Sequence, residues 1–369
     1  MKIKVAIPIV DEEEVQAVRE VLLSGHYTSG PKVKEFEEKF ADYIGVKYAV
    51  AVNSGTAALH LGLATLGIKS GDEVIVPAMT FFATASAVVH QGGTPVFCDI
   101  DNNYCMDPAD LKKRITERTK AIIPVHLYGY AANMEEILKI AKEHNLKVIE
   151  DCAQGIGTEI DGKKVGQFGD CGAFSFFATK NMTTGEGGII TTDNEEIANM
   201  AKILRSHGMT NRNDHEYIGY NYRMSEINAA IGLTQLKKLP EMNKKRIENS
   251  KYLLNNIKDI DWLVLEKEPQ NVTHSYFWCP LQIDESKLGM TTLQLRQLLF
   301  EKGVETRHRY IEPLYKQNAL KNNQNIDYKQ ISLKNAEAFS GKLLGLPNHP
   351  KLTKEELDYI IKILHEVGK

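Results

Sequence analysis

Short apolar runs typical of β-strands alternate with helical patterns through most of the first 192 residues of this chain. The runs lie at 47–53, 73–77, 95–100, 120–126, 146–151, 173–177 and 188–192. Strands that alternate with helices usually pair in parallel, and the helices then cover both faces of the sheet. The sequence therefore predicts an α/β fold whose large domain contains a mostly parallel sheet of about seven strands.

The last third of the 369-residue chain is less regularly patterned, and the length is sufficient for two domains. A helical pattern from Ser225 to Asn249 leads into this part, and an amphipathic helix with a capping-box start at Thr353 closes it. We predict a large domain at 1–245, which includes an N-terminal arm, and a small α+β domain at 246–369. The polar segment 206–224 is long for a compact domain, which is typical of lids, binding loops and interface arms.

Composition excludes several classes of partner. The formal net charge is -3, and no basic stripe for nucleic acid or an anionic membrane is visible. The N-terminal run is short, is broken by Pro8 and is followed by acids, so it resembles neither a signal peptide nor a membrane span. We expect no nucleic-acid and no membrane partner.

The five cysteines lie far apart, without the spacing of a metal site or a disulfide framework. They are Cys98, Cys105, Cys152, Cys171 and Cys279. We therefore expect no metal site, and a reducing, cytoplasmic setting.

Lys180 lies in a turn of small residues between the strand-like runs 173–177 and 188–192. Burial penalises an ammonium group and lowers its pKa, so a lysine held between two buried strands is a candidate Schiff-base nucleophile. The alternative is an ordinary turn lysine with its amine in water.

Asp151 ends the run 146–151, at the carboxyl end of a predicted parallel strand, where open α/β sheets bind ligands. Pyridoxal phosphate needs a lysine that holds it as a Schiff base and a carboxylate that keeps its pyridine nitrogen protonated. Lys180 and Asp151 match this pair. A helix N-cap is the alternative role for Asp151.

Two further stretches fit such a cofactor. A Ser-Gly-Thr turn at 54–56 opens a helical pattern, whose free N–H groups suit a phosphate, although such residues often serve only as caps. Phe81 and Phe82 follow another strand-like run. One ring in this place suits stacking on a planar cofactor, and the other suits core packing.

The chain resembles the DegT/DnrJ/EryC1/StrS family of pyridoxal-phosphate-dependent sugar aminotransferases. The motifs that carry the resemblance are, in order, SGTAAL, PAMTFFAT, HLYG, EDCAQGIGT, SFFATKNMTTGEGG, RSHG and GYNYRMSEINAAIG. The match runs from Pro8 to the final helix, and the ordered set is specific where one motif alone would be weak.

The resemblance implies a fold-type-I enzyme: a large sheet domain, a smaller C-terminal domain, and a homodimer whose active sites are shared. It implies that Lys180 forms the Schiff base and that Asp151 pairs with the pyridine nitrogen. Gln154 would bond the ring hydroxyl, and Phe81 would stack on the ring.

The resemblance also assigns residues to the cofactor phosphate. Thr56, with the amides around Gly55 and Ala57, and Ser175 would hold it. Asn221 would reach the phosphate of the neighbouring subunit's cofactor, which gives the polar segment before it a role.

The implied reaction moves an amino group from glutamate to a keto-sugar linked to a nucleotide, in ping-pong order, with Lys180 transferring the proton. The turn NMTTGEGG resembles the branch that aminates C4 of 4-keto-6-deoxy sugars more than the branch that aminates C3. Three alternatives stay open: a C3-keto-sugar aminotransferase, a cyclitol aminotransferase, and a non-catalytic cofactor-binding regulatory protein. Arg307, His308 and Arg309 are candidates for contacts with a diphosphate, or else form a solvated charged surface.

Overall fold

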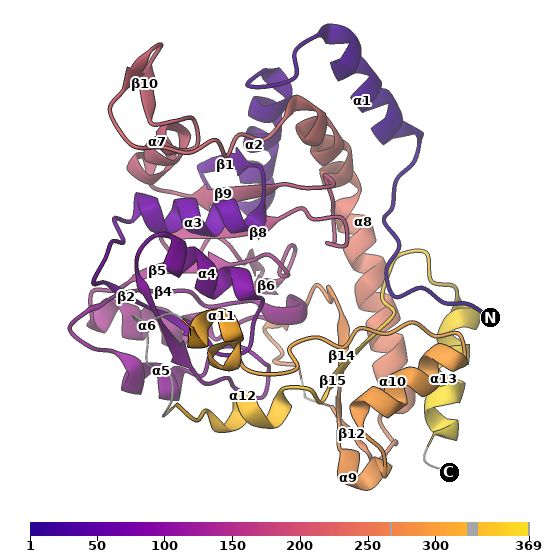
Figure 1. The fold of residues 1–369 in the computed structure, drawn as a ribbon. Coiled ribbons are helices and arrows are strands. Elements are labelled where there is room, and N and C mark those ends of the chain that lie inside the picture. The colour runs from indigo at the N-terminus through magenta and orange to yellow at the C-terminus, as the bar shows by residue number, and fades with distance from the viewer. Residues whose placement is uncertain (266–267, 323–330, 368–369) are drawn as a thin grey trace.

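A computed structural model describes residues 1–265, 268–322 and 331–367. Its larger part is built on a seven-stranded sheet with the order β1-β9-β8-β5-β4-β2-β3 (Figure 1). The strands are β1 (Tyr48–Val52), β2 (Glu73–Pro77), β3 (Thr94–Cys98), β4 (Thr119–Ile122), β5 (Lys147–Asp151), β8 (Cys171–Ser175) and β9 (Gly188–Thr192). Strands β3, β2, β4, β5 and β8 pair in parallel, and β9 is antiparallel to both β8 and β1. The predicted mostly parallel, seven-stranded sheet is confirmed.

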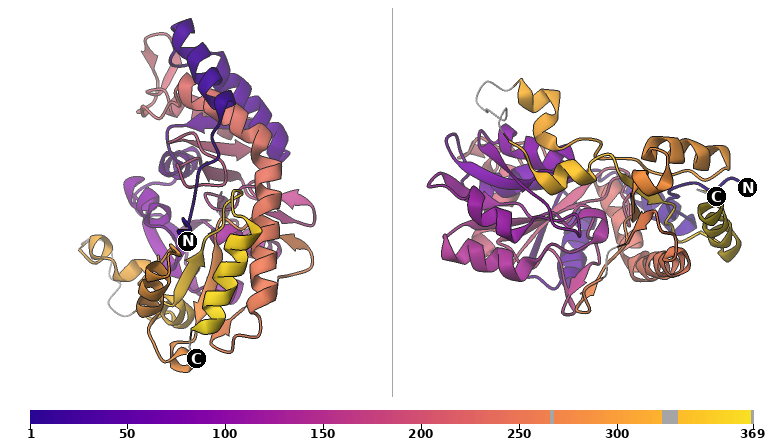
Figure 2. Two further views of the ribbon diagram at one scale, coloured as in Figure 1. Left: turned by 90° about the vertical axis from the view of Figure 1, so that its right-hand side faces the viewer. Right: turned by 90° about the horizontal axis from the view of Figure 1, so that it is seen from below.

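Helices cover both faces of this sheet and continue into the smaller part (Figures 1 and 2). The α-helices are α1 (Glu12–Ser24), α2 (Pro31–Ile44), α3 (Gly55–Thr65), α4 (Phe82–His90), α5 (Pro108–Arg114), α6 (Met134–Glu143), α7 (Glu195–Leu204), α8 (Glu226–Ile257), α9 (Glu285–Leu288), α10 (Thr292–Glu301), α11 (Asn318–Lys321), α12 (Lys334–Phe339) and α13 (Lys354–Glu366). Two 3-10 turns lie at Leu127–Gly129 and Leu314–Lys316.

Alternate side chains of β1 point to opposite faces, as the two-residue period of a strand requires. Val50 and Val52 belong to the core that includes α3, whereas Ala49 and Ala51 belong to the core that includes Phe36 of α2. Both faces are therefore buried, which explains why β1 reads as a continuous apolar run.

One strand boundary differs from the prediction for a clear reason. The predicted strand 120–126 ends at Ile122 in β4, because Pro124 lacks an N–H group for the ladder. The chain leaves the regular ladder gradually: Ile123 N–H still donates to the Ile75 carbonyl at 2.8 Å, and Val125 forms an isolated bridge with Asp151. This exit brings the next turn to the carboxyl end of β5.

A second core joins the antiparallel sheet β12 (Leu263–Val264), β14 (Cys279–Ile283) and β15 (Leu343–Leu346) to α10 and α13. The long helix α8 serves both cores: Leu239 packs with α2, and Leu253 packs in the second core. The predicted domain boundary at 245/246 falls inside α8 and stays a proposal.

Shorter strands complete the fold. They are β6 (Glu159–Ile160), β7 (Lys163–Lys164), β10 (Met209–Asn211), β11 (Asp214–His215) and β13 (Val272–Thr273). Strands β10 and β11 form a hairpin within the polar segment 206–224, and this hairpin projects from the body of the molecule (Figure 1). Over the described ranges, no helix combines the length and apolar character needed to cross a membrane.

Candidate functional site

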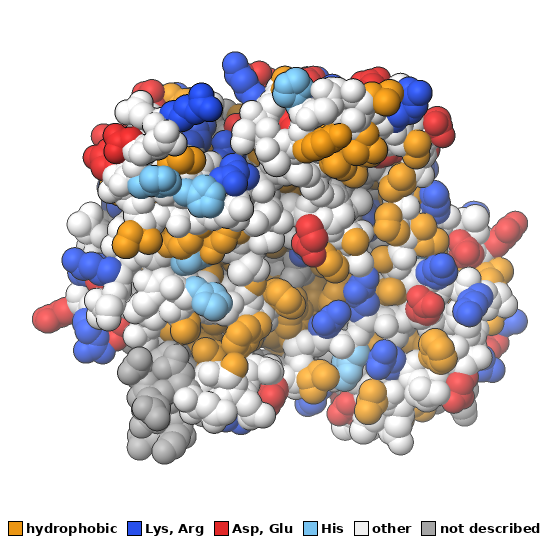
Figure 3. Space-filling view, turned by 45° about the horizontal axis from the view of Figure 1, so that its top comes forward, with side chains coloured by type: hydrophobic (Ala, Val, Ile, Leu, Met, Phe, Trp, Pro, Cys, Tyr) orange, Lys and Arg blue, Asp and Glu red, His pale blue; other side chains and the backbone are white. Residues whose placement is uncertain are grey.

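A cavity of about 390 Å³ opens at the carboxyl ends of β5 and β8, between the sheet and residues of the C-terminal part. We call it the lysine cavity. Its lining residues are Ser54, Gly55, Thr56, Thr80, Phe81, Ala83, Val125, Asp151, Ala153, Gln154, Ser175, Phe177, Thr179, Lys180, Glu186, Phe277, Trp278, Arg307, Arg309 and Tyr310. On the face drawn in Figure 3, hydrophobic side chains gather around a central hollow.

The turn that carries Lys180 is fixed to α8. Asn181 Nδ2 donates to Asn243 Oδ1 at 2.9 Å, and Asn228 Nδ2 donates to the carbonyl of Thr184 at 2.6 Å. These bonds hold the part of the turn that directly follows the lysine, so its side chain projects from an anchored backbone.

The Lys180 amine lies against an aromatic ring, with Nζ 4.7 Å from the ring centroid of Phe277. Burial lowers the pKa of Lys180 to about 8; the Asp151 carboxylate opposes this shift, and the Arg307 guanidinium adds to it. A larger fraction of the amine is therefore neutral near physiological pH than for an ordinary lysine. The neutral amine is the form that attacks a carbonyl carbon.

Asp151 is almost completely buried beside this amine, at 4% exposure. Its Oδ2 accepts from the Thr84 hydroxyl at 2.8 Å, and its Oδ1 accepts from the Ala153 amide at 3.1 Å. Burial raises the pKa of Asp151, and the two hydrogen bonds and Lys180 oppose that rise. No helix begins at the described residues that follow Asp151, so the N-cap alternative is wrong.

The N-terminus of α3 forms one wall of the lysine cavity. Ser54 caps the helix by accepting from the Ala57 amide at 3.1 Å, so this amide is already engaged. The N–H groups of Gly55 and Thr56 have no partner within the helix, as at every helix start. A Cβ at Gly55 would lie 2.7 Å from the Ser175 Cβ, so only glycine fits this close approach.

The two phenylalanines divide as predicted between cavity and core. Phe81 is 57% exposed and lines the lysine cavity, whereas Phe82 packs against the main core. Gln154 is held from two sides: its Oε1 accepts from the Tyr128 amide at 2.9 Å, and its Nε2 donates to the Tyr310 hydroxyl at 2.8 Å.

Seven of the nine predicted site residues line the lysine cavity, and the two that do not are Ala57 and Asn221. Asn221 is exposed, and its carbonyl accepts from Asn53 Nδ2 at 3.2 Å. Its neighbours Tyr220 and Tyr222 stack with ring centroids 4.8 Å apart. Its predicted contact with a partner subunit therefore stays a prediction.

Sequence reasoning missed several residues of the site. Thr84 lies three residues after Phe81 in the same motif, but only the fold brings its hydroxyl to Asp151. Phe277, Trp278 and Tyr310 come from the C-terminal part. The aromatic stretches HSYFWCPL and ETRHRYIEPLY, which contain them, were the available signal.

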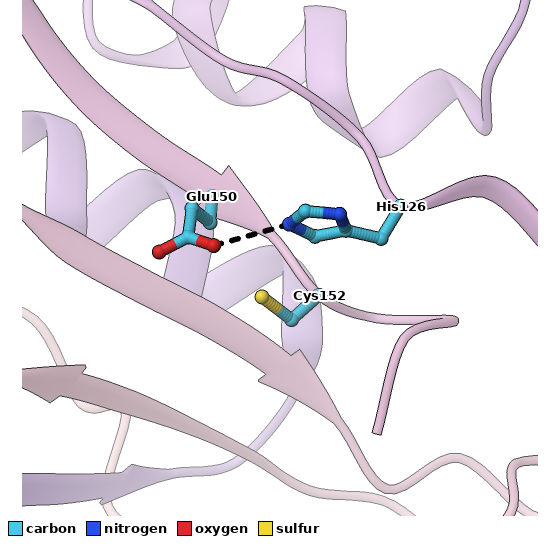
Figure 4. A group of neighbouring side chains, drawn as sticks. All are labelled: His126, Glu150 and Cys152. Atoms are coloured by element: carbon cyan, nitrogen blue, oxygen red, sulfur yellow. Dashed lines mark hydrogen bonds and ion pairs between the residues drawn. The ribbon is translucent and has the colours of Figure 1, made fainter. Parts of the chain in front are cut away.

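A buried group behind the cavity, His126, Glu150 and Cys152, has side chains close enough together to hold a metal ion (Figure 4). Its polar atoms are already engaged. His126 Nε2 lies 3.1 Å from Glu150 Oε2, and His126 Nδ1 accepts from the Ala132 amide at 3.2 Å. Glu150 also accepts from the amides of Gly166, Phe168 and Gly169. Burial raises the pKa of the Cys152 thiol, so we interpret the group as a structural network.

The lysine cavity thus combines an amine of lowered pKa, a buried carboxylate and a helix N-terminus suited to an anion. This set fits Schiff-base chemistry on a carbonyl compound that also carries a phosphate.

Comparison with known proteins supports the same chemistry. The DegT/DnrJ/EryC1/StrS aminotransferase family matches residues 8–365. A GDP-perosamine synthase from Caulobacter vibrioides is 40% identical over 99% of this chain and 98% of its own length. A pleiotropic regulatory protein from Geobacillus stearothermophilus is 36% identical over 96% of this chain and 94% of its own length.

Among solved structures, a putative sugar aminotransferase from Streptococcus pneumoniae, Spr1654 in its PMP form, matches with a TM-score of 0.92 and 32% identity. The match covers 100% of this chain and 98% of that one. The resemblance seen in the sequence motifs is therefore confirmed by both sequence and fold. The chain belongs to the DegT/DnrJ/EryC1/StrS aminotransferase family, whose members depend on pyridoxal phosphate, and it is an aminotransferase.

Proposed function

We propose that this chain transfers an amino group from glutamate to C4 of a 4-keto-6-deoxyhexose carried on a nucleoside diphosphate. The observation that carries the proposal is the convergence of Lys180, Asp151 and the start of α3 on one cavity. Sugar aminotransferases among the relatives supply the substrate class. The choice of C4 over C3 rests on the resemblance of the turn that follows Lys180.

The lysine cavity fits pyridoxal phosphate. Lys180 would bond its aldehyde carbon, Asp151 would face its ring nitrogen, and Phe81 would cover one face of the ring. Gly55, Thr56 and Ser175 would hold the phosphate, and Gln154 would contact the ring hydroxyl. Bound there, the cofactor supplies an electron sink for the pair released when the donor's C–H bond breaks.

The chain's own residues supply the proton transfer. With donor and cofactor in place, the free Lys180 amine would take the proton from the donor's α-carbon and pass it to the reacting carbon of the cofactor. With the keto-sugar it acts in the reverse direction, so the kinetics are ping-pong. The lowered pKa of Lys180, about 8, suits a group that both accepts and donates a proton near neutral pH.

Space for the nucleotide lies outside the lysine cavity. A second depression of about 570 Å³, which we call the outer hollow, shares Phe81, Arg307 and Arg309 with the cavity and also contains Arg296. Guanidinium groups pair well with phosphate oxygens. The exposed Arg309 and Arg296 are therefore our candidates for the diphosphate.

We further propose a cytoplasmic homodimer with shared sites. All five cysteines are free thiols, which agrees with a reducing compartment. Leu23 on α1 is 71% exposed and Ile218 near Asn221 is 97% exposed, as expected for surfaces that a partner covers. A mixture of Lys180→Ala and Asn221→Ala subunits would restore one intact site in each hybrid dimer. Mixtures no more active than their parents would contradict shared sites.

The first experiment is the visible spectrum of the protein with pyridoxal phosphate, before and after L-glutamate, for wild type and Lys180→Ala. We expect glutamate to convert the pyridoxal band of the wild type to the pyridoxamine form, and the variant to lack the starting band. A cofactor band that no amino donor changes would overturn the proposed function and favour a regulatory role. The regulatory role is included as an alternative because one relative is named as a regulatory protein.

The acceptor is tested on the pyridoxamine form with a panel of nucleotide-linked 4-keto and 3-keto sugars and a keto-cyclitol. Return of the pyridoxal band reports the reaction, and NMR of the product locates the new amine. An amine on C3 or on a cyclitol would contradict the C4 assignment and leave the transamination itself standing.

A further inference from the structure

Arg307, His308 and Arg309 are consecutive basic residues at the boundary between the lysine cavity and the outer hollow. Their surroundings differ. His308 Nε2 lies 2.7 Å from the carbonyl of Gly341 and so is engaged within the fold. Arg307 and Arg309 both line the lysine cavity and the outer hollow, but Arg309 is exposed whereas Arg307 is partly buried. Arg307 is therefore the cation of this group that is built into the site.

The backbone of Arg307 is fixed to the small sheet. Its N–H donates to the Gly345 carbonyl at 2.9 Å, and its own carbonyl accepts from the Gly345 amide at 2.7 Å. The guanidinium carbon lies 5.4 Å from the ring centroid of Trp278. Two backbone bonds and a cation–π contact thus orient this side chain before any ligand arrives.

The charge of Arg307 is not neutralised within the part of the chain that is described. Its Nε is buried without a hydrogen-bond partner there, and no carboxylate there lies within ion-pair distance of it. Burial first, and then the charge of Arg309, lower the pKa of Arg307. The Glu305 carboxylate opposes this lowering of the pKa without forming an ion pair with Arg307. An oriented, partly desolvated cation with no directly paired carboxylate is a binding site for an anion.

Arg307 and Lys180 share one aromatic surface. Lys180 Nζ contacts Phe277, the rings of Phe277 and Trp278 stack with centroids 5.5 Å apart, and Arg307 contacts Trp278. The charge of Arg307 also lowers the pKa of Lys180, which agrees with their closeness. An anion bound by Arg307 would therefore lie on the same aromatic surface as the Lys180 amine.

The two proposed substrates differ in where their negative charge lies. An amino-acid donor carries a carboxylate on the same carbon that bears the reacting amine. A nucleotide-linked 4-keto-sugar carries its charge on the diphosphate, on the opposite side of the sugar ring from the keto carbon. The aromatic surface that Arg307 shares with Lys180 favours the donor carboxylate over the diphosphate as its ligand.

We propose that Arg307, held by Trp278, binds the α-carboxylate of the amino donor and so selects an α-amino acid in the first half-reaction. The inference rests on the proposed function, because it requires an α-amino acid as donor. It assigns the two substrates to different cations: the donor carboxylate to the partly buried Arg307, and the diphosphate to the exposed Arg309.

The test measures the affinity for a donor probe and the affinity for a nucleotide probe separately, on variants of the holoenzyme. Arg307→Gln removes the charge, Arg307→Lys keeps it without the planar guanidinium, and Lys113→Gln removes a surface charge on α5, away from both cavities. The donor probe is 2-methyl-L-glutamate, which lacks the α-hydrogen and so cannot transaminate, and its binding is followed by the spectrum. The nucleotide probe is GDP, followed by calorimetry.

We expect Arg307→Gln to weaken binding of 2-methyl-L-glutamate by at least about 30-fold, the usual result of removing one member of a desolvated charge pair. Arg307→Lys should recover part of this loss, and Lys113→Gln should match the wild type. Binding of GDP should change less than about threefold in Arg307→Gln, well below the loss typical of a phosphate-pairing cation. A loss of GDP affinity with unchanged donor affinity would overturn the inference.

A second measurement separates recognition from a structural defect. Wild type should react with L-glutamate much faster than with 4-aminobutyrate, which has the same amine and distal carboxylate but no α-carboxylate. Arg307→Gln should lose most of this preference. If the preference persists, the inference is wrong although the proposed function stands; if no α-amino acid converts the wild type, both are wrong.

Discussion

Glu150 and Asp151 are adjacent carboxylates on one strand, and the structure uses them in opposite ways. The Glu150 carboxylate is closed off by three backbone amides and by His126. Among the described residues, the Asp151 carboxylate accepts hydrogen bonds only from the Thr84 hydroxyl and the Ala153 amide, and it lines the cavity that contains Lys180. Successive side chains of a strand point to opposite faces, which gives the two residues different surroundings.

The difference shows that the number of hydrogen bonds to a buried carboxylate indicates whether it serves the fold or a ligand. A carboxylate whose acceptor positions are all filled stabilises the fold and has little capacity left for a ligand. A carboxylate with few donors, beside a cation and an open cavity, keeps that capacity. Substitutions of the two carboxylates and of the residues that contact them test this division between a structural and a functional carboxylate.

The largest effect is expected from Asp151→Ala. We expect the rate of proton transfer to fall by about 10³-fold, because this charge stabilises the reacting ring electrostatically. Affinity for pyridoxal phosphate should fall far less, since Lys180 and the start of α3 remain. Stopped-flow spectra with glutamate and a cofactor titration measure the two quantities, and near-normal turnover would remove Asp151 from its assigned role.

Glu150→Ala should act on stability instead. It leaves three backbone amides and His126 without their acceptor, and we expect the free energy of unfolding to fall by about 3–5 kcal/mol. Urea unfolding measures this, with Asp151→Asn as the matched control that should unfold close to the wild type. If Asp151→Asn were the less stable of the two, the division between the carboxylates would be wrong.

Thr84→Val tests the hydrogen bond that orients Asp151. Without the hydroxyl the pKa of Asp151 rises further, because a bond to its charged form is lost. We expect the half-reaction with glutamate to slow by about tenfold, in line with the loss of one hydrogen bond to a charged group. Thr84→Ser keeps the hydroxyl and should retain most of the rate; equal losses in both variants would point to packing instead.

The smallest effect is a shift in pH dependence. Only the neutral amine of Lys180 bonds the cofactor, so the rate of pyridoxal phosphate incorporation should rise with pH around a midpoint near 8. Asp151 raises the pKa of Lys180 and Arg307 lowers it, so Asp151→Asn should move the midpoint down and Arg307→Gln should move it up. Shifts in the same direction in both variants would contradict these charge contacts.

Much of the site was predictable because its signals are local. Lys180 stands in a turn between two strand-like runs, and Asp151 ends another, so neighbouring residues made both of them candidates. The pairing of the two and the ordered motifs then favoured the cofactor role over a turn lysine and a helix N-cap. The start of α3 was visible in the same way. Ala57 shows the limit of such reasoning, since its amide, assigned to the phosphate, is engaged by the Ser54 cap.

The sequence by itself determined the α/β class, the run of strands, the family and the two central residues of the cavity, because strand periodicity and motifs are properties of short segments. Only the tertiary structure decided that Thr84 supports Asp151, that Tyr310 holds Gln154, and that Arg307 lies on the aromatic surface of Lys180. These pairs are joined across 67 to 156 residues or through rings of the C-terminal part. Contacts at such separation arise when segments far apart in the chain pack around the main core, which no local pattern of residues records.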